Sequence, residues 1–131
     1  MIVLDASALL ELLLVTPAGV SVAKRIASER ETLHAPQLID LEVLQVLRRF
    51  AASGALDPGR AEQALEDLQS LDLERYPHQP LLDRLWQLRA NVTAYDAAYL
   101  ALAEALLAPL LTFDARLAGA AGHTAQIELL D

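Results

Sequence analysis

Four acidic residues of this chain lie beside apolar sequence, where a carboxylate is energetically expensive unless something compensates it. Asp5 follows the first apolar run, Asp114 follows another near the C-terminus, and Glu42 and Asp96 interrupt the apolar faces of expected helices. If the four converge, their charges repel one another. A hard divalent cation that prefers oxygen ligands would relieve that repulsion. The four acids therefore predict a magnesium or manganese site.

Such a site suits the hydrolysis of a phosphodiester bond. A bound cation lowers the pKa of a coordinated water and offsets the charge that develops on the phosphate. A second ion about 4 Å away would hold both the attacking and the leaving oxygens. Asp5, Glu42 and Asp96 are the expected primary ligands, directly or through water. Asp114 is expected to be a second-site or water-positioning acid.

Each acid also has a structural interpretation. Asp5 and Asp114 come between a strand and a helix, where Asp is a good N-cap. Thr93 and Asp96 are spaced like a capping box, and Glu42 could belong to a structural ion pair. The strand-end positions favour function, because ligands of open α/β sheets bind outside the carboxyl ends of the strands.

The elements that must position these acids follow from apolar runs and from helix start and stop signals. Strands are expected at 2–4, 32–35, 71–74, 110–113 and 127–129. Helices are expected at 6–14, 17–29, 36–53, 58–70, 81–89, 94–107 and 115–120. This alternation predicts an α/β fold with a parallel sheet covered by helices on both faces.

Helical spacing separates two acids of the segment 36–53. Glu42 has Leu38, Ile39 and Val46 as its neighbours three or four residues away, so its side chain is expected to be at least half-buried. Asp40 is expected on the solvated polar face of the same helix. The histidines have no metal-ligand spacing, and no phosphate-binding loop or nucleophile triad is present.

Length and composition limit the class of protein. The 131 residues predict one domain, 1–131, and 54% hydrophobic against 21% charged residues excludes disorder. The lack of cysteine fits a reducing compartment and excludes zinc–thiolate sites. No signal-peptide pattern is present, and Glu104 and Pro109 interrupt the longest apolar tract, 97–113. We therefore expect a cytoplasmic protein without a membrane segment.

The net charge of -8 argues against a nucleic-acid partner, which rewards basic surfaces. A metal held by the four acids would weaken that argument by neutralising their charges. The basic residues are also unevenly placed, at Lys24, Arg25 and Arg30 and again at Arg48 and Arg49. These charges allow for a lone subunit that binds RNA weakly, or for one that needs a basic partner to bind it.

Four segments resemble the PIN-domain ribonucleases, and most closely the VapC toxins of bacterial toxin–antitoxin modules. They are IVLDASALLEL, APQLIDLEVLQVLRR, VTAYDAAYLALA and LLTFDARLA, in the right order along nearly the whole chain. The resemblance implies a three-layer α/β/α sandwich around a parallel sheet. It also implies an endoribonuclease that is held inactive by a cognate VapB-type antitoxin and is commonly dimeric.

The resemblance also implies a role for each acid. Asp5, Glu42, Asp96 and Asp114 match the residues that bind one or two Mg²⁺ or Mn²⁺ ions in that family. Some relatives carry a further acid just after the fourth, where this chain has Arg116. That departure leaves the occupancy of a second metal site open.

Two other classes of function remain. A catalytically inactive interaction module could keep the PIN fold, although the intact set of four acids argues against it. A receiver-like phosphoacceptor domain also gathers acids around Mg²⁺, but it needs a lysine after its last core strand. The one lysine of this chain, Lys24, stands elsewhere. Binding of Mn²⁺ would separate the inactive module from an enzyme.

Overall fold

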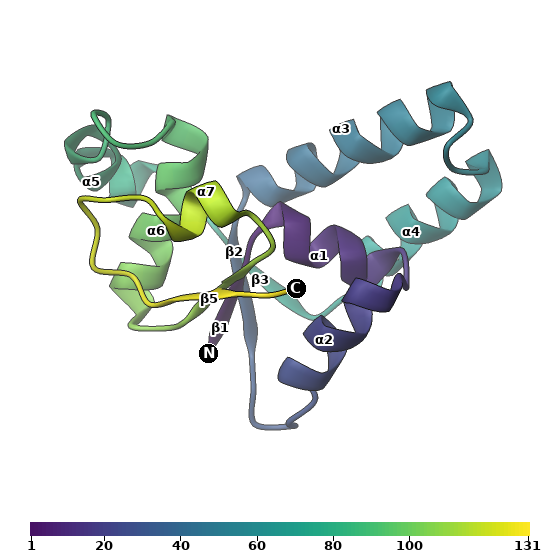
Figure 1. Ribbon diagram of the computed structural model, residues 1–131, viewed down its shortest axis with the longest axis horizontal. Helices are drawn as coiled ribbons and strands as arrows, with labels where there is room; N and C mark the ends of the chain where they lie inside the picture. Colours follow the sequence, from purple (N-terminus) through teal and green to yellow (C-terminus); the bar gives the residue numbers. More distant parts are fainter.

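Five short apolar segments form one parallel sheet in the computed structural model, which describes residues 1–131 (Figure 1). The strands are β1 (Ile2–Leu4), β2 (Leu33–Pro36), β3 (Leu73–Tyr76), β4 (Leu110–Thr112) and β5 (Ile127–Leu129). Their order across the sheet is β3-β2-β1-β4-β5, and every pair is parallel. All residues of β1 and β4 are buried, as strands covered on both faces require.

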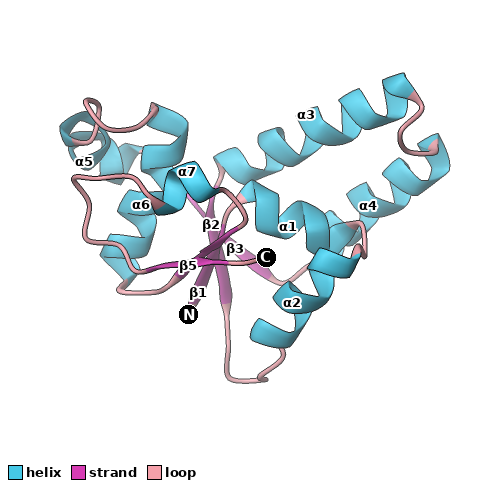
Figure 2. Cartoon of the chain, viewed as in Figure 1, coloured by secondary structure: helices cyan, strands magenta, loops and turns pink.

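Helices cover both faces of this sheet. They are α1 (Ala6–Leu13), α2 (Pro17–Arg25), α3 (Leu38–Ser53), α4 (Pro58–Ser70), α5 (Leu82–Gln87), α6 (Ala94–Leu106) and α7 (Ala115–Ala118), with a 3₁₀ turn, η1, at Gln79–Leu81. In Figure 2, α5 and α6 lie on one side of the strands, and α1 and α2 lie on the other. The antiparallel pair of α3 and α4 projects beyond the sheet (Figure 1). The predicted α/β fold with a parallel sheet is confirmed.

Local capping signals determine where several helices begin and where α3 ends. Thr16 caps α2 by accepting a hydrogen bond from the Gly19 N–H at 3.0 Å. Asp57 caps α4 in the same way, and Pro17 and Pro58 occupy the first helical positions. α3 ends at Gly54, whose φ of 81° is left-handed and suits a residue without a Cβ.

α1 and α2 pack closely across a sharp turn. A Cβ on Gly19 would lie 2.2 Å from the carbonyl oxygen of Glu11, so only glycine permits this approach. The two helices together have the length and composition of a membrane span, but they are bent by 109°. No single helix is long and apolar enough to cross a bilayer.

Several predicted boundaries are wrong by two to four residues. β2 includes Pro36, so α3 begins at Leu38 rather than at residue 36. Pro36 is tolerated as the last residue of the strand, where the next N–H, that of Gln37, bonds the Tyr76 carbonyl at 2.9 Å. β3 lies two residues later than predicted, because its register against β2 pairs Leu33 with Leu73.

The remaining differences lie at helix ends. α2 ends at Arg25, not at residue 29, and α7 is one turn long rather than spanning 115–120. The predicted helix 81–89 is divided into η1 and the short α5. Pro80 lies in η1, where a missing backbone N–H is tolerated because this turn precedes the helix.

The chain reverses its direction across the sheet between β1 and β4. From β1 it proceeds to β2 and β3 on one side, whereas β4 and β5 lie on the other. Such a switch point leaves a crevice at the carboxyl ends of the two central strands. Asp5 directly follows β1, and Asp114 follows β4 after one residue. The fold therefore brings these two acids to the same crevice.

Candidate metal centre

Asp5 is held on both of its carboxylate oxygens. It is 6% exposed and caps α1. Its Oδ1 accepts hydrogen bonds from Ser7 Oγ at 2.6 Å and from the Ala8 N–H at 2.9 Å, and its Oδ2 accepts one from the Thr112 hydroxyl. Burial raises the pKa of Asp5, and these hydrogen bonds only partly oppose that effect. The cap and the functional position are thus the same carboxylate.

Two hydroxyl groups tie the ends of β1 and β4 together. Thr112, which is fully buried, donates to Asp5 and accepts from the Asp114 N–H at 2.9 Å. Ser7 donates to Asp5 and accepts from the Phe113 N–H at 3.0 Å. Because each hydroxyl bonds one strand end to the other, the orientation of Asp5 is fixed relative to the start of α7.

Glu42 reaches the crevice from α3, and a hydroxyl group is its partner. The Tyr99 hydroxyl, on α6, donates to Glu42 Oε1, and Tyr99 is only 2% exposed. Burial raises the pKa of Glu42, and the nearby Asp96 and Asp5 raise it further. Burial also raises the pKa of Tyr99, so its hydroxyl stays protonated as a donor. The structural ion pair considered for Glu42 is not formed.

The other two acids lie at the starts of two helices. The Asp96 N–H donates to Thr93 Oγ1 at 3.2 Å, which confirms Thr93 as the cap of α6. Burial raises the pKa of Asp96, and Asp114 adds to the rise. Asp114 caps α7 by accepting from the N–H groups of Arg116 at 2.9 Å and Leu117 at 3.4 Å.

The four acids form one electrostatic cluster. Asp114 raises the pKa of both Asp5 and Asp96, while Glu42 is affected by Asp5 and Asp96. The expected mutual repulsion contributes to these raised pKa values, and burial is the larger cause in each case. One basic side chain approaches the cluster: Arg116 Nη2 lies 3.8 Å from Asp114 Oδ2. Negative charge is thus concentrated here with little compensation.

The donor chemistry of the cluster fits a hard divalent cation. All four side chains offer carboxylate oxygens, and hydrogen bonds orient those of Asp5 and Glu42 as outer-shell partners orient metal ligands. No three acidic or histidine side chains stand close enough to ligate one ion together. Mg²⁺ commonly takes one or two carboxylates and keeps several waters. The set therefore fits an ion held by one or two acids directly and by the others through water.

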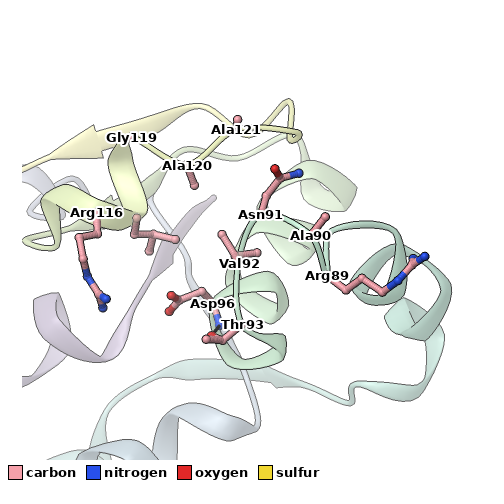
Figure 3. Close-up of a pocket in the computed structure, with 11 residues that line it drawn as sticks. Arg89, Ala90, Asn91, Val92, Thr93, Asp96, Arg116, Gly119, Ala120 and Ala121 are labelled. Carbon is pink, nitrogen blue, oxygen red and sulfur yellow. Dashed lines mark hydrogen bonds between the residues drawn. The ribbon is translucent and has the colours of Figure 1, made fainter.

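Two cavities flank the cluster. One, of about 790 Å³, has a mixed polar and apolar lining and includes Asp96, Asn91, Arg89 and Arg116 in its walls (Figure 3). The other, of about 570 Å³, is mainly apolar, lies between α1 and α3, and has Glu42 at its edge. The acids are thus accessible from two different directions.

A family model for the PIN domain matches residues 2–122. The chain is 45% identical to Ribonuclease VapC12 of Mycobacterium tuberculosis over 130 residues, which cover 99% of both chains. This chain belongs to the PIN-domain family, among the VapC ribonucleases. It is also 44% identical to Ribonuclease VapC1 of the same species, over 98% of this chain and 96% of that one. The predicted family is confirmed.

Solved structures support the same fold for this VapC-family chain. PAE2754 from Pyrobaculum aerophilum matches with a TM-score of 0.65 and 27% identity, over 88% of this chain and 81% of that one. VapBC2 from Rickettsia felis, in a crystal structure with a DNA fragment from its promoter, matches with a TM-score of 0.66 over the whole of both chains. At 16% identity, the second likeness concerns the fold alone.

Sequence reasoning missed several residues that position the acids of this PIN domain. Tyr99 looked like a core residue, and nothing in the sequence pairs it with Glu42. Arg116 was noted only as a departure from an acidic position. Asp40 was expected to be solvated, but its Oδ2 pairs with Arg75 Nε at 2.7 Å. That prediction is wrong because β3 brings Arg75 against α3, which helical spacing alone does not reveal.

Proposed function

We propose that this VapC-family chain is a Mg²⁺- or Mn²⁺-dependent endoribonuclease, with Asp5, Glu42, Asp96 and Asp114 as its metal-binding and catalytic acids. The main support is the cluster itself: three of these acids have a raised pKa, and no strong ion pair neutralises any of them. A divalent cation would compensate the charge, and the ribonuclease names of the relatives indicate the substrate.

The acids and their hydroxyl partners have different roles in the proposed cleavage of RNA. A bound cation would activate water and offset negative charge on the scissile phosphate. Asp5, Glu42 and Asp96 would hold the cation as its primary ligands, one or two of them directly and the rest through water, whereas Asp114 would serve a second ion or position water. Thr112 and Tyr99 do not react; their hydroxyl groups keep Asp5 and Glu42 in one orientation. Attack by water in line with the leaving oxygen produces 3′-hydroxyl and 5′-phosphate ends.

The substitution Asp5→Asn tests the proposal. The amide keeps an acceptor for Ser7 and Ala8, so the fold is expected to survive. Loss of a charged ligand is expected to slow cleavage of RNA in Mn²⁺ about 1,000-fold, since a metal ion contributes several kcal/mol to the transition state.

Asp72→Asn is the matched control for that experiment. Asp72 is exposed and precedes β3, at the opposite edge of the sheet from the acids. Cleavage by this variant is expected to equal that of the unsubstituted protein. If Asp5→Asn also cleaves normally, the site assignment is wrong. If the unsubstituted protein binds no Mn²⁺ in calorimetry, the inactive interaction module becomes the better account.

The proposal includes a VapB-type antitoxin as partner, and its support is the apolar cavity between α1 and α3. Leu41, which is 68% exposed, and Tyr95, which is 63% exposed, line it together with Leu10. An amphipathic helix could bury these side chains and direct an arginine toward Glu42. We also propose that the chain is one domain, 1–131, that it dimerises and that it acts in the cytoplasm.

Recovery of the protein from its native host at native expression levels tests the partner. The expected complex contains a small second protein and cleaves no RNA until that protein is removed. Leu41→Asp should weaken the complex, because a charge would enter the apolar surface, and should leave the RNA cleavage of the free protein intact. Recovery of the protein alone would count against an antitoxin.

A further inference from the structure

Two arginines border the cavity of about 790 Å³ beside the acids, although the net charge of the protein is -8. Figure 3 shows Arg116, from α7, beside Asp96 on one side of this cavity, and Arg89, from the loop after α5, at the opposite rim with its guanidinium directed away from Asp96. Asp96 lies between them (Figure 3). The wall between α7 and the C-terminal loop consists of small residues, 119–121, which leave the cavity open. One guanidinium, that of Arg116, thus lies beside the candidate metal centre, and a second, that of Arg89, lies at the far rim of the cavity.

The Arg116 guanidinium is not used by the fold. Its side chain is 89% exposed, and Asp114 is 3.8 Å away, beyond hydrogen-bond distance. Asp96 also feels the charge of Arg116 but makes no hydrogen bond with it. Other arginines of the chain are bound tightly: Arg25 and Arg84 each make two hydrogen bonds of 2.8 Å to a carboxylate. The N–H donors of Arg116 are therefore free for a ligand beside the acids.

Arg89 is held in place but keeps free donors. Its guanidinium carbon lies 4.4 Å from the centre of the Trp86 ring, and its Nη1 donates to the Trp86 carbonyl at 2.8 Å. Trp86 is 68% exposed, so the stacked pair stands at the surface. Stacking on an aromatic ring leaves the edge of a guanidinium available for an anion.

We propose that this cavity carries the RNA strand on one side of the scissile bond, with Arg116 bound to the phosphate next to the metal centre and Arg89 bound to a phosphate farther along. The proposal rests on the ribonuclease function proposed above. A guanidinium matches two oxygens of a phosphate, and arginines that bind phosphates supply most of the affinity for a nucleic-acid backbone. An acidic protein repels the phosphates of RNA. The two arginines would offset that repulsion, because they place positive charge along the path of the strand.

The salt dependence of RNA binding tests this path. Binding of a fluorescent single-stranded RNA is measured by anisotropy over a range of NaCl concentrations at fixed Mg²⁺, with Asp5→Asn present throughout to prevent cleavage. Each lost phosphate contact is expected to reduce the slope of log affinity against log salt by about 0.7. Arg116→Ala and Arg89→Ala should each show this reduction and bind about 10-fold more weakly. Arg116→Lys should keep the slope, because its charge remains.

Arg30→Ala is the matched control. Arg30 is exposed and lies before β2, at the edge of the sheet opposite to the acids. Its removal lowers the net charge by the same amount, so any effect of overall charge would appear in this variant too. The proposed path requires that the slope for Arg30→Ala stays within error of the unsubstituted value.

Cleavage and metal binding separate the remaining explanations. With Asp5 intact, Arg116→Ala is expected to lower kcat/KM about 10- to 100-fold, as loss of a charge-assisted hydrogen bond predicts, while Mn²⁺ affinity stays equal or increases. Weaker Mn²⁺ binding with an unchanged salt slope would assign Arg116 to the metal centre and overturn the path. An unchanged slope for either arginine would overturn it as well. Lack of RNA cleavage by the unsubstituted protein would instead refute the proposed function.

Discussion

Two carboxylates on the same helix, α6, have opposite environments. Glu104, near its end, accepts hydrogen bonds from Arg84 Nε and Nη2 at 2.8 Å, from the Thr124 N–H at 2.8 Å and from Thr124 Oγ1 at 3.0 Å. Chiefly because of the bond to Arg84, the pKa of Glu104 is lowered to about 2. Asp96, at the helix start, has a raised pKa because of burial and of Asp114.

The difference separates a carboxylate that stabilises the fold from one that is available to a ligand. The N-terminus of a helix favours negative charge, so position on α6 alone would lower the pKa of Asp96. Burial and the neighbouring Asp114 instead raise the pKa of Asp96. Acids whose pKa is raised by burial and by a neighbouring carboxylate are typical of functional sites, where stability is sacrificed for activity.

The largest change in stability is expected from Glu104→Gln. Gln keeps the shape of Glu104 but loses the charge that faces Arg84, and hydrogen bonds to charged groups contribute about 1.5–3 kcal/mol each. The free energy of unfolding should fall by about 2 kcal/mol in urea denaturation at pH 7. RNA cleavage should stay unchanged, since the hydrogen bonds of Glu104 to Arg84 and Thr124 are separate from the acid cluster. If Glu104→Gln is as stable as the unsubstituted protein, Glu104 does not stabilise the fold and its contrast with Asp96 is refuted.

Low pH should remove the same contribution. The folded pKa of Glu104, about 2, lies below its ordinary value of 4.5, so its stabilising effect is complete above pH 4.5 and is lost as the pH falls toward 2. The difference in unfolding free energy between the unsubstituted protein and Glu104→Gln should therefore shrink over this range. Denaturation at several pH values in EDTA measures this difference in unfolding free energy. A difference that stays constant with pH would contradict the claim that the ionised Glu104 carboxylate stabilises the fold.

An intermediate effect, on activity, is expected from Tyr99→Phe. The Tyr99 hydroxyl lowers the pKa of Glu42, so its removal should raise that pKa further and leave Glu42 without a fixed orientation. Cleavage in Mn²⁺ should fall about 10-fold, equivalent to about 1.4 kcal/mol, and the acidic limb of its pH profile should move to higher pH. A loss of cleavage without movement of that limb would indicate a purely structural role.

The smallest effect is expected from Asp114→Asn without metal. The pKa values of Asp5 and Asp96 are higher in the folded protein than in the unfolded chain. Their contribution to stability is therefore present at low pH and is lost as the pH rises through the folded values. Removal of the Asp114 charge relieves both acids, so the variant should be more stable than the unsubstituted protein by about 1 kcal/mol in EDTA at pH 7. Asn also keeps the cap of α7.

Added Mn²⁺ should reverse that order. A cation that binds only the folded state raises Tm. Mn²⁺ should raise the Tm of the unsubstituted protein more than the Tm of Asp114→Asn. Asp72→Asn, whose site is remote from the acids, should follow the unsubstituted protein in both conditions. If Asp114→Asn melts lower in EDTA and Mn²⁺ moves neither protein, the acids are caps rather than metal ligands.

The sequence by itself determined which segments form strands and helices and where most helices begin. Thr16, Asp57 and Thr93 act within three residues of their own position, so their effect is visible in the local sequence. The same holds for the end of α3 at Gly54. The acids were recognisable because each contradicts the apolar pattern around it, a conflict that is typical of functional positions.

Only the tertiary structure decided what those acids contact. The bond between Tyr99 and Glu42 spans 57 residues, and the bond between Thr112 and Asp5 spans 107. Such pairs depend on the order of strands in the sheet and on the packing of α6 against it, which is set by the burial of the whole apolar core. Local patterns carry no information about these distant partners, so the raised pKa values of Asp5, Glu42 and Asp96, and the free guanidinium of Arg116, became apparent only in the folded chain.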